Sequence, residues 1–594
     1  RLVYDRISNL EPPLLSRLDR GEKGGFMEGK KPLSERIFIG VAWPYANGPL
    51  HLGHVAGCYL SADIFARYHR AKGNEVLMVS GSDSHGTPIT VRAEAEGVTP
   101  EEILNRYHPQ FLDSWDKLGI SFDLFTSTHT ENHQEVVHDL FSVLLEKGYL
   151  YEQAMLLAYC PDCQRFLPDR YVNGTCPHCG FERARGDQCD NCGRTLDPQD
   201  LIQPRCVISN SEPEFRESEH FFLKLSVFEK PLLDWVKQQT HWRPNVLNFT
   251  RRFLEDGLKD RAITRDLTWG VPIPLDGYEG KRIYVWFEAV SGYLSAAVEW
   301  AKLHGDGKGW EAFWKDPDTK SYYFIGKDNI PFHTIIWPAI LMAYGGGLNL
   351  PYDVPANEFL SLEDRKFSTS ENWAVWVHDY LSRYDPDPLR YLLSINMPES
   401  GDTNFSWAEF IRRNNDELVA TFGNLVHRVL SFTYRNFDEK VPPAGPPGDL
   451  EQELLQSARE VMDSVDRDLH DCHFKAAIGR AFGLAQQVNR YLDTRAPWQS
   501  IKTDRPEAAT TLYTAMTVIN CLKMLLYPFL PFSAQRLHEF LGLDGAAESL
   551  SWDFDELVQA IQPGNPLRQP SPLYTKFDPQ VVDDEVQRLG ASVA

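Results

Sequence analysis

Two histidines, His51 and His54, stand three residues apart in the segment PYANGPLHLGHVAG. The apolar run RIFIGVAWP before them predicts a buried strand, Asn47-Gly48 marks a turn, and apolar residues at helical spacing follow. Taken alone, such a pair also occurs as an ordinary structural feature. At the start of a helix that leaves the carboxyl end of a strand, however, unpaired N–H groups and the helix dipole favour phosphate. The spacing therefore indicates phosphate chemistry, and Gly53 would let a nucleotide approach the backbone closely.

A second predicted strand ends in an acidic group. The apolar run Val76–Val79 breaks into the small and polar residues GSDSHG, which include Asp83 and His85. Successive parallel strands end at the same edge of a sheet, so these side chains are expected to face the same crevice as the histidines. Asp83 is a candidate to bind a substrate ammonium group. The alternative is a carboxylate that only caps its own turn.

Three Cys-x-x-Cys pairs lie between residues 160 and 192. Thiolates with this spacing supply two corners of a tetrahedron, so two such pairs close a structural zinc site. The last two pairs form a compact set of four that is expected to hold zinc, whereas the first pair would need Cys206 and a further ligand to hold a second metal. Disulfide bonds are the alternative. The compact set is Cys176, Cys179, Cys189 and Cys192, and the first pair is Cys160 and Cys163.

Two later segments, residues 282–296 and 322–341, each predict a strand that runs into a helix. Aromatic or polarizable side chains near these strand ends could wall an apolar side-chain pocket. Each of them, taken singly, also fits an ordinary core position. These residues are Trp286, Tyr293, His333 and Trp337.

From about residue 406 onward, long helical periods replace the strand signals. The segment NNDELVATFGNLVHRVLSF places its apolar residues on one face and Asn424 and Arg428, four residues apart, on another. Trp498 follows Pro497 at the end of another predicted helix. An exposed indole near arginine is a common means of stacking on unpaired RNA bases. This region therefore predicts a helical bundle with an RNA-binding surface.

The composition limits the class of protein. A chain of 594 residues has room for several domains, and its 42% hydrophobic content suits large buried cores. The formal net charge of −23 gives no global sign of nucleic-acid binding, so any RNA contact has to be local. We find no apolar run long enough to span a bilayer and no secretory leader, which predicts a cytoplasmic protein with reduced cysteines. The polar segment before Glu35 is expected to be a flexible extension, or to lie upstream of a start at Met27.

The order of these motifs resembles the class I methionyl-tRNA synthetase family over nearly the whole chain from Glu35 onward. PYANGPLHLGH is similar to the nucleotide signature of that family, GSDSHGTPI to its amino-group strand, and VWFEAVSGY and FIGKDNIPFH to its methionine pocket. The cysteine pairs match its connective insertion, and EFIRRNNDELVATFGNLVHR and APW match its anticodon-binding bundle. The joint match is far more specific than any single motif.

The resemblance implies an α/β fold: a class I Rossmann-type catalytic domain with a parallel sheet and a zinc-knuckle insertion, followed by an α-helical bundle that binds the anticodon. The expected order is an N-terminal extension at 1–34, the two Rossmann halves at 35–150 and 263–355 with the insertion at 151–262 between them, a catalytic-loop and stem-contact region at 356–405, the anticodon-binding domain at 406–560, and a C-terminal tail that packs back at 561–594.

It also implies roles for individual residues. His51 and His54, with Lys366 and Arg365, would be catalytic, and they would act on ATP phosphates while the carboxylate of methionine attacks the α-phosphorus. The implied ATP-binding residues are Asn47, Gly48, His51, Gly53, His54, Lys366 and Ser368. The implied methionine-binding residues are Ala42, Trp43, Tyr45, Asp83, Trp286, Ala289, Tyr293, Asp328, His333 and Trp337. The implied anticodon-binding residues are Asn424, Arg428 and Trp498.

The sequence departs from the family pattern in three places. The mobile catalytic loop, usually Lys-Met-Ser-Lys-Ser, reads Lys366-Phe367-Ser368-Thr369-Ser370 and lacks the second lysine. Arg365 and Lys366 are therefore expected to share the work of that lysine. Trp43 stands where many relatives carry leucine, and Val290 replaces a common proline of the pocket wall.

The implied cofactors are one structural Zn²⁺, a possible second Zn²⁺ at Cys160 and Cys163, and Mg²⁺ with ATP. The implied partners are ATP, L-methionine and methionine tRNA, both initiator and elongator; no membrane is involved and a monomer is expected. Two alternatives remain. A class I synthetase for another hydrophobic amino acid should carry a large editing insertion, and a catalytically lapsed paralogue that only binds tRNA would explain the missing loop lysine.

Overall fold

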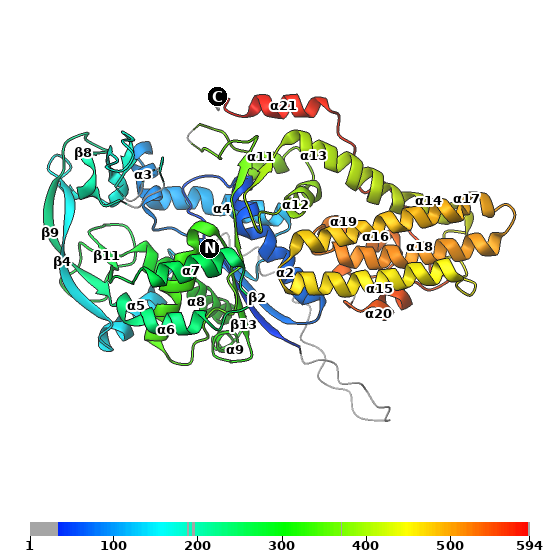
Figure 1. The fold of residues 1–594 in the computed structure, drawn as a ribbon, viewed down its shortest axis with the longest axis horizontal. Helices are drawn as coiled ribbons and strands as arrows, with labels where there is room; N and C mark the ends of the chain where they lie inside the picture. The colour runs from blue at the N-terminus through cyan, green and yellow to red at the C-terminus, as the bar shows by residue number, and fades with distance from the viewer. Residues whose placement is uncertain are drawn as a thin grey trace. The chain divides into compact units, whose positions relative to one another are not determined.

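Five parallel strands form the centre of the catalytic part, in the order β14-β13-β1-β2-β3 (Figure 1). This computed structural model describes residues 34–186, 189, 191–192, 196–369, 371–549 and 551–591. Residues 1–33 of the expected extension, with Met27, and Ser370 of the catalytic loop lie outside the described residues. The strands are β1 (Arg36–Val41), β2 (Glu75–Ser82), β3 (Leu124–Ser127), β13 (Lys320–Gly326) and β14 (Ala356–Asn357).

Alternate residues of these strands belong to two separate hydrophobic cores, because successive side chains of a strand point to opposite faces of a sheet. Ile37 and Ile39 of β1 lie in one core, and Phe38 lies in the other. Strands buried on both faces explain the nearly continuous apolar runs in the sequence. The predicted parallel-sheet fold is confirmed.

Helices connect the strands and cover both faces of the sheet (Figure 1). The helix after the two histidines is continuous from Leu52 to Ala71, although its second turn is π-helical. It comprises α1 (Leu52–His54), η2 (Val55–Tyr59) and α2 (Leu60–Ala71). The other elements of this part are α3 (Thr87–Glu96), α4 (Pro100–Leu118), α5 (Glu131–Glu146), α8 (Val285–His304), α9 (Trp310–Trp314), η6 (Lys327–Asn329), the π-helical η7 (Phe332–Ile336) and α10 (Trp337–Tyr344).

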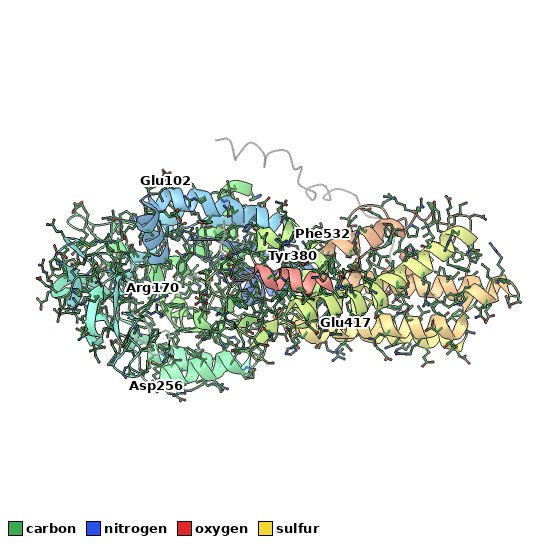
Figure 2. The ribbon with its side chains drawn as sticks, turned by 90° about the horizontal axis from the view of Figure 1, so that it is seen from above. Glu102, Arg170, Asp256, Tyr380, Glu417 and Phe532 are labelled. Atoms are coloured by element: carbon green, nitrogen blue, oxygen red, sulfur yellow. The ribbon has the colours of Figure 1, made fainter. Side chains whose placement is uncertain are left out.

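The cysteine-rich insertion is built on a long antiparallel pair, β4 (Leu150–Cys160) and β9 (Glu214–Leu223). A small sheet, β7-β6-β8, carries the cysteine pairs and has its own hydrophobic core. The remaining elements are β5 (Arg165–Phe166), η3 (Asp169–Tyr171), β6 (Val172–Thr175), β7 (Ala184–Arg185), η4 (Pro198–Asp200), β8 (Ile202–Cys206), η5 (Leu225–Phe228), α6 (Glu229–Val236), α7 (Pro244–Glu255), β10 (Arg261–Ala262), β11 (Thr264–Arg265) and β12 (Arg282–Ile283). Figure 2 labels Arg170 among these strands.

A region of short elements leads from the sheet to the bundle. It comprises β15 (Leu360–Leu362), α11 (Val377–Leu381), α12 (Pro386–Ile395), β16 (Thr403–Phe405), α13 (Trp407–Arg413) and the π-helical η8 (Asn414–Gly423). β15 and β16 pair in parallel. Because β15 ends at Leu362, shortly before Lys366, this pairing holds the start of the expected catalytic loop.

The C-terminal region is a helical bundle, as predicted. It comprises α14 (Asn424–Asn436), α15 (Asp449–His470), α16 (Phe474–Arg495), α17 (Pro497–Ser500), α18 (Arg505–Leu526), α19 (Pro531–Phe540), η9 (Ala547–Ser549) and α20 (Phe554–Ala560), and the tail helix α21 (Gln580–Arg588) follows. Among the described residues, one helix, α18, is long and apolar enough to cross a membrane by length and composition alone. However, 89% of its apolar window is buried inside the protein, where it packs against α15 and α16.

A fully buried arginine joins the bundle to the catalytic part. Arg390 of α12 donates from Nη2 to Oδ2 of Asp63 at 2.6 Å, and Asp63 lies on the same continuous helix as His54. The guanidinium also donates to the main-chain oxygens of Leu118, Pro528 and Phe529 at 3.2, 2.9 and 2.8 Å. We call these five residues the Arg390 joint.

Candidate active site

His51 and His54 cap the helix that follows them. His51 Nδ1 accepts the N–H of Gly53, and His54 Nδ1 accepts the N–H of His51, each at 3.1 Å. A neutral imidazole whose Nδ1 accepts a hydrogen bond carries its proton on Nε2. Each ring therefore keeps one donor, Nε2–H, that no hydrogen bond uses among the described residues. A side chain at Gly53 would lie 2.9 Å from the His51 ring, which explains the glycine.

Burial keeps both histidines uncharged. The two ring centroids lie 3.9 Å apart. Burial lowers the pKa of His54 to about 4, and burial together with His54 lowers the pKa of His51 well below its usual range. Without a ligand, the two side chains are therefore neutral at neutral pH, and each offers an Nε2–H donor.

The loop that carries Lys366 lies against these histidines. The ring of Phe367 stacks on that of His51, with centroids 4.7 Å apart and planes at 9°. Just after the loop, the chain pairs with the histidine segment, and the N–H of Leu52 donates to the oxygen of Val375 at 3.1 Å. Two motifs that are far apart in the sequence thus form one site.

The two neighbouring cations of the loop differ in their surroundings. Nη2 of Arg365 lies 3.0 Å from Oε2 of Glu371, and the guanidinium lies 4.2 Å over the ring of Trp373. Lys366 is exposed and forms no ion pair within the described residues. The two cations therefore differ in the structure: Arg365 has partners within the hairpin, whereas Lys366 is exposed.

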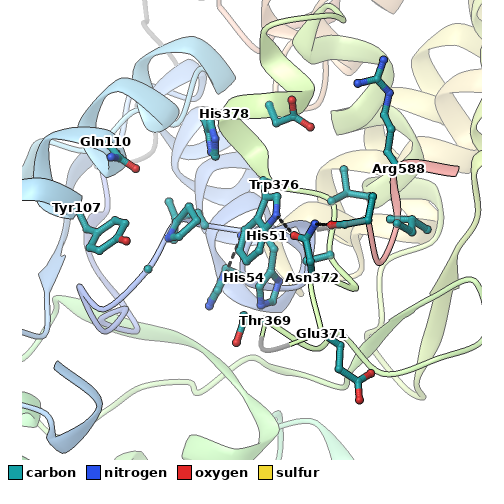
Figure 3. A pocket seen from close by; sticks show the side chains of 18 of the residues that line it. His51, His54, Tyr107, Gln110, Thr369, Glu371, Asn372, Trp376, His378 and Arg588 are labelled. Atoms are coloured by element: carbon teal, nitrogen blue, oxygen red, sulfur yellow. Dashed lines mark hydrogen bonds between the residues drawn. The ribbon is translucent and has the colours of Figure 1, made fainter. Parts of the chain in front are cut away.

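A cavity of about 1270 Å³ opens beside the two histidines (Figure 3). Tyr107 and Gln110 of α4 form a wall across from His51, and Arg588 enters from the C-terminal tail. Thr369, at the position of the missing lysine, also lines this cavity. The cavity is large enough for a nucleotide, and its lining includes the predicted ATP-binding residues Asn47, Gly48, His51 and His54.

Asp83 is a buried carboxylate at the end of β2. Its Oδ1 accepts the N–H of His85 at 3.3 Å, so the predicted turn cap exists, and its backbone pairs with Tyr45. Burial, reinforced by the charge of Glu288, raises the pKa of Asp83 well above its usual range. Asp83 forms no ion pair in the part of the chain that the structure describes. A substrate ammonium group would supply the missing counter-charge.

Trp43, Tyr293 and His333 form a continuous cluster next to Asp83 in the fold. Trp43 and Tyr293 meet edge to face at 6.4 Å, and Gly292 makes room for the indole, since a Cβ there would lie 2.8 Å from it. His333 donates from Nδ1 to the oxygen of Asn329 at 2.8 Å, so its Nε2 accepts the hydroxyl of Tyr293 at 2.7 Å. Apart from this hydrogen-bonded pair and the indole N–H of Trp43, which is buried without a hydrogen-bond partner among the described residues, the wall is apolar, as suits an amino-acid side-chain pocket.

The other predicted pocket residues differ in how deeply they are buried. Trp337 is fully buried, donates to the hydroxyl of Tyr323 at 3.2 Å and packs on Trp314, so it occupies the ordinary core position that the sequence left as an alternative. Trp286 is 39% exposed. Ala42 and Ala289 are half-buried, and Asp328 is exposed. Tyr45 is the one predicted methionine-binding residue that lines the large cavity within the described chain.

Sequence reasoning missed Glu288 and His133. Glu288 Oε2 lies 2.7 Å from His133 Nε2 in the buried layer between α8 and α5, and Glu288 Oε1 lies 3.2 Å from His85 Nδ1. The available signal was a single acidic residue in the apolar segment VWFEAVSGY.

The cysteines form two clusters. The four predicted zinc ligands, Cys176, Cys179, Cys189 and Cys192, have sulfur atoms within 4.8 Å of one another, with 3.9 Å from Cys176 to Cys192 and 3.6 Å from Cys179 to Cys189. Zinc bonds of about 2.3 Å give sulfur–sulfur distances of about 3.8 Å in a tetrahedron, so this set fits zinc. No disulfide links any of the ten cysteines.

The second cluster contains Cys160, Cys163 and Cys206. Its fourth corner is polar rather than sulfur: Ser209 Oγ lies 3.2 Å from Cys160 Sγ. Ser209 stands where the pair Cys206-x-x-Ser209 would otherwise have a second cysteine. Three thiolates and a hydroxyl make a weaker zinc site than four thiolates.

The predicted anticodon-binding residues lie together on the bundle. The guanidinium of Arg428 lies 4.8 Å over the ring of Trp498, which is half-buried. Nη2 of Arg428 also donates to Oδ1 of Asn489 at 3.2 Å. Asn424 lies one turn before Arg428 and is exposed. The stack holds the indole in a fixed orientation.

Comparison with known proteins shows two family matches. Residues 37–430 match the family model described as tRNA synthetases class I (M). Residues 441–593 match the model described as the anticodon binding domain of methionyl tRNA ligase.

Similar proteins include the methionine–tRNA ligase of Dehalococcoides mccartyi strain CBDB1, which is 59% identical over 94% of this chain and 100% of its own length. That of Thermomicrobium roseum is 53% identical over 94% of this chain and 99% of its own. Among solved structures, the Mycobacterium tuberculosis methionyl-tRNA synthetase in complex with methionyl-adenylate superposes with a TM-score of 0.76 at 25% identity, covering 91% of this chain and 99% of that one.

Proposed function

The chain belongs to the methionyl family of class I tRNA synthetases, and from that premise we propose that it is a methionine–tRNA ligase. It would first form methionyl-adenylate from methionine and ATP with release of pyrophosphate. It would then transfer the methionyl group to the 3′ end of methionine tRNA and release AMP. A class I synthetase for another amino acid lacks support, since all the relatives named above are specific for methionine.

One observation carries this proposal: Phe367 of the catalytic loop stacks on His51 of the nucleotide signature beside a cavity large enough for ATP. The neutral Nε2–H groups of His51 and His54 would donate to phosphate oxygens. Lys366 would bring the positive charge that they lack. Asn47, Gly48 and Ser368 would complete the nucleotide site, and Gly53 keeps its backbone accessible.

The reaction needs no covalent enzyme intermediate. A carboxylate oxygen of methionine forms a bond to the α-phosphorus, the bond from that phosphorus to the bridging oxygen of the β-phosphate breaks, and the electron pair leaves with pyrophosphate. The protein contributes by holding the reactants in line and by stabilising charge that develops on the phosphate oxygens. Fixed neutral donors with one mobile cation suit this task, because the cation can arrive only as charge builds up.

Methionine would bind with its ammonium group on Asp83, beside Tyr45 and Trp286. Trp43, Tyr293 and His333, with Ala42 and Ala289, would surround the thioether. The hydrogen bond from Tyr293 to His333 supports this role, since it fixes both rings without adding a charge to the pocket. Trp337 would support the wall from the core, and Asp328 would lie at its exposed end.

The cysteine clusters could hold zinc, and we assign one Zn²⁺ to Cys176, Cys179, Cys189 and Cys192, where it would stabilise the insertion. The cluster with Cys160 and Cys163 would hold a second ion only weakly, because serine replaces its fourth cysteine. Mg²⁺ would enter with ATP and neutralise phosphate charge.

The tRNA would contact the bundle through Asn424, Arg428 and Trp498, and initiator and elongator methionine tRNA would share this surface. We propose that the protein acts as a monomer. The absence of disulfides among the ten cysteines supports a reducing compartment such as the cytoplasm.

Amino-acid-dependent exchange between ATP and labelled pyrophosphate tests the function. The proposal expects exchange with methionine and none with isoleucine. Exchange with isoleucine instead would identify another class I synthetase. Tight binding of methionine tRNA without exchange by either amino acid would identify the lapsed paralogue.

A further inference from the structure

A chain of buried polar side chains connects Asp83 to the interior of the catalytic part. His85 donates its main-chain N–H to Asp83 Oδ1 at 3.3 Å, and its ring Nδ1 lies 3.2 Å from Glu288 Oε1. The other oxygen of Glu288 lies 2.7 Å from Nε2 of His133. Glu288 is fully buried and His133 is 1% exposed. Two carboxylates therefore share one buried region, although the proposed reaction uses only one of them.

The hydrogen bonds of His133 show how the second carboxylate is neutralised. The hydroxyl of Ser295 donates to the oxygen of Gly292 at 3.0 Å, so it must accept from Nδ1 of His133, 2.8 Å away. On its other side, the ring shares a proton with Glu288. Whichever of the two atoms holds that proton, His133 and Glu288 together carry no net charge.

The ionisation of Asp83 depends on this pairing. Burial and the charge of Glu288 both act to raise the pKa of Asp83. Burial would also raise the pKa of Glu288, but His85 and His133 outweigh it and hold this pKa at about 2. Without a cationic partner, Glu288 would compete with Asp83 for a proton, because two nearby buried carboxylates cannot both ionise cheaply.

Few other titratable groups face this pair. His129 Nδ1 lies 3.1 Å from Nε2 of His85, and its ring stacks on Trp269. Tyr45 pairs through its backbone with Asp83. The charge of Arg170 lowers the pKa of Tyr45, and that of Tyr284 raises it. Next to Asp83, Ser82 is bonded to His108. Of these groups, only His85 and His133 contact the carboxylate of Glu288 directly.

We propose that His133 and Glu288 are positioning residues that keep the region behind Asp83 electrically neutral, so that Asp83 alone supplies the negative charge that selects the α-ammonium group of methionine. The inference rests on the proposed function, in particular on Asp83 as the ammonium ligand. His133 lies on α5 and Glu288 on α8, and neither residue touches the substrate in this arrangement.

The variant His133→Gln tests the inference. It removes the cationic partner but keeps a polar side chain, so one proton would be shared between Glu288 and Asp83. The acidic limb of kcat/KM for methionine should move to higher pH by ~1 unit or more, and the KM for methionine at pH 6 should rise several-fold. The KM for ATP should stay within about twofold, because the nucleotide site is separate.

Two controls separate charge from packing. His138→Gln alters a histidine of the same helix whose one side-chain hydrogen bond within the described residues is to the main-chain oxygen of Pro272, and it should leave the pH profile unchanged. The double variant Glu288→Gln/His133→Gln restores neutrality with two uncharged side chains and should return the methionine profile to that of the wild type, which tests the inference even if His133→Gln folds poorly. A double variant with the same defect as His133→Gln, or a single variant with the wild-type profile, would overturn it.

An inhibitor without the amino group supplies an independent reading. 4-(Methylthio)butanoate is methionine without its ammonium group, so its inhibition constant should not change in His133→Gln. Equal weakening of methionine and of this inhibitor would indicate a distorted pocket and overturn the inference. The variant Asp83→Asn separates a failure of the proposed function from a failure of this inference. If Asp83→Asn leaves the KM for methionine unchanged, Asp83 does not bind the ammonium group and the proposed role of Asp83 is wrong. If Asp83→Asn raises the KM while His133→Gln does not, only the neutralising role of His133 and Glu288 is wrong.

Discussion

In the site that we propose for phosphate, hydrogen-bond donors and positive charge come from different residues. His51 and His54 are committed through Nδ1 to their own backbone, and burial keeps them neutral. Arg365 is held in the hairpin by Glu371 and Trp373. Lys366 is exposed and forms no ion pair within the described residues, so we propose that it brings positive charge to the leaving pyrophosphate.

Replacement of Lys366 by alanine should slow adenylate formation by ~10²-fold or more, the usual cost of losing one preorganised donor to a transition state. Methionine affinity should change little, because the lysine acts on the phosphates. Thr369→Lys should change the rate by less than about tenfold, since the loop already has its cation. Pre-steady-state formation of methionyl-adenylate measures both. A nearly normal rate in Lys366→Ala would disprove the role of the loop, and a wild type that is active only with Thr369→Lys would mean a lapsed enzyme.

Among the elements, a π-helical turn joins two of the predicted pocket residues. The turn Phe332–Ile336 is π-helical and directly precedes α10, which begins at Trp337. His333 accepts a hydrogen bond from Tyr293, Trp337 packs on Trp314, and both rings contact Tyr323. Sequence periodicity does not predict this turn, because the apolar pattern continues through it.

Local spacing predicted other features well. The strands before His51 and Asp83 were evident from their apolar runs, and Cys176 to Cys192 were evident from their paired spacing. The contact between Glu288 and His133 was not evident from the sequence, since it depends on how α5 packs against α8. Ser209 was missed for a different reason: a serine at a cysteine position leaves no signal until its distance to Cys160 is known.

The zinc content of the insertion should follow its thiolates. Freshly purified protein is expected to contain about one zinc per chain. Cys176→Ser should remove it and destabilise the insertion, because metal binding and local folding are coupled. Ser209→Cys completes the second set and should raise the content to about two. Elemental analysis measures both, with exchange activity as a control for folding. Active wild-type protein without zinc, or Ser209→Cys protein that still holds one ion, would contradict this.

Helix α18 contains a lysine at a fully buried position. Lys523 donates to Oδ1 of Asn520 at 2.7 Å and faces His538, and burial lowers its pKa to about 7. Between pH 7 and 10 the unfolded chain binds the additional proton, so the free energy of unfolding should rise with pH across this window. Below pH 7 both states are protonated and the folded state bears the full cost of the buried charge.

Lys523→Met should therefore gain stability relative to the wild type mainly at neutral pH. The difference in unfolding free energy, variant minus wild type, should fall by about 2–4 kcal/mol from pH 7 to pH 10. Urea titrations at several pH values measure it, and Lys502→Met at an exposed position serves as the control. A difference that does not vary with pH would mean that Lys523 stays charged in the fold.

At the scale of the whole molecule, recognition and chemistry are expected to separate. If Trp498 stacks on a base of the anticodon, Trp498→Ala should weaken aminoacylation by ~1–3 kcal/mol and leave exchange without tRNA nearly intact. The control is Phe554→Ala, which removes a similar stack, with Arg459 at 4.3 Å, from another part of the bundle. Equal losses in aminoacylation and exchange would indicate misfolding or a wrong assignment.

The Arg390 joint has a consequence for how such proteins can be recombined. Its donors are satisfied by Asp63, by the end of α4 and by the turn between α18 and α19, all of them buried. A chimera that took its bundle from a distant relative would have to reproduce those carbonyl positions or leave a charged group unsatisfied in the core. The two halves of the chain match separate family models, yet they should be inherited together, and gene fusions should tolerate breakpoints outside this joint far better than within it.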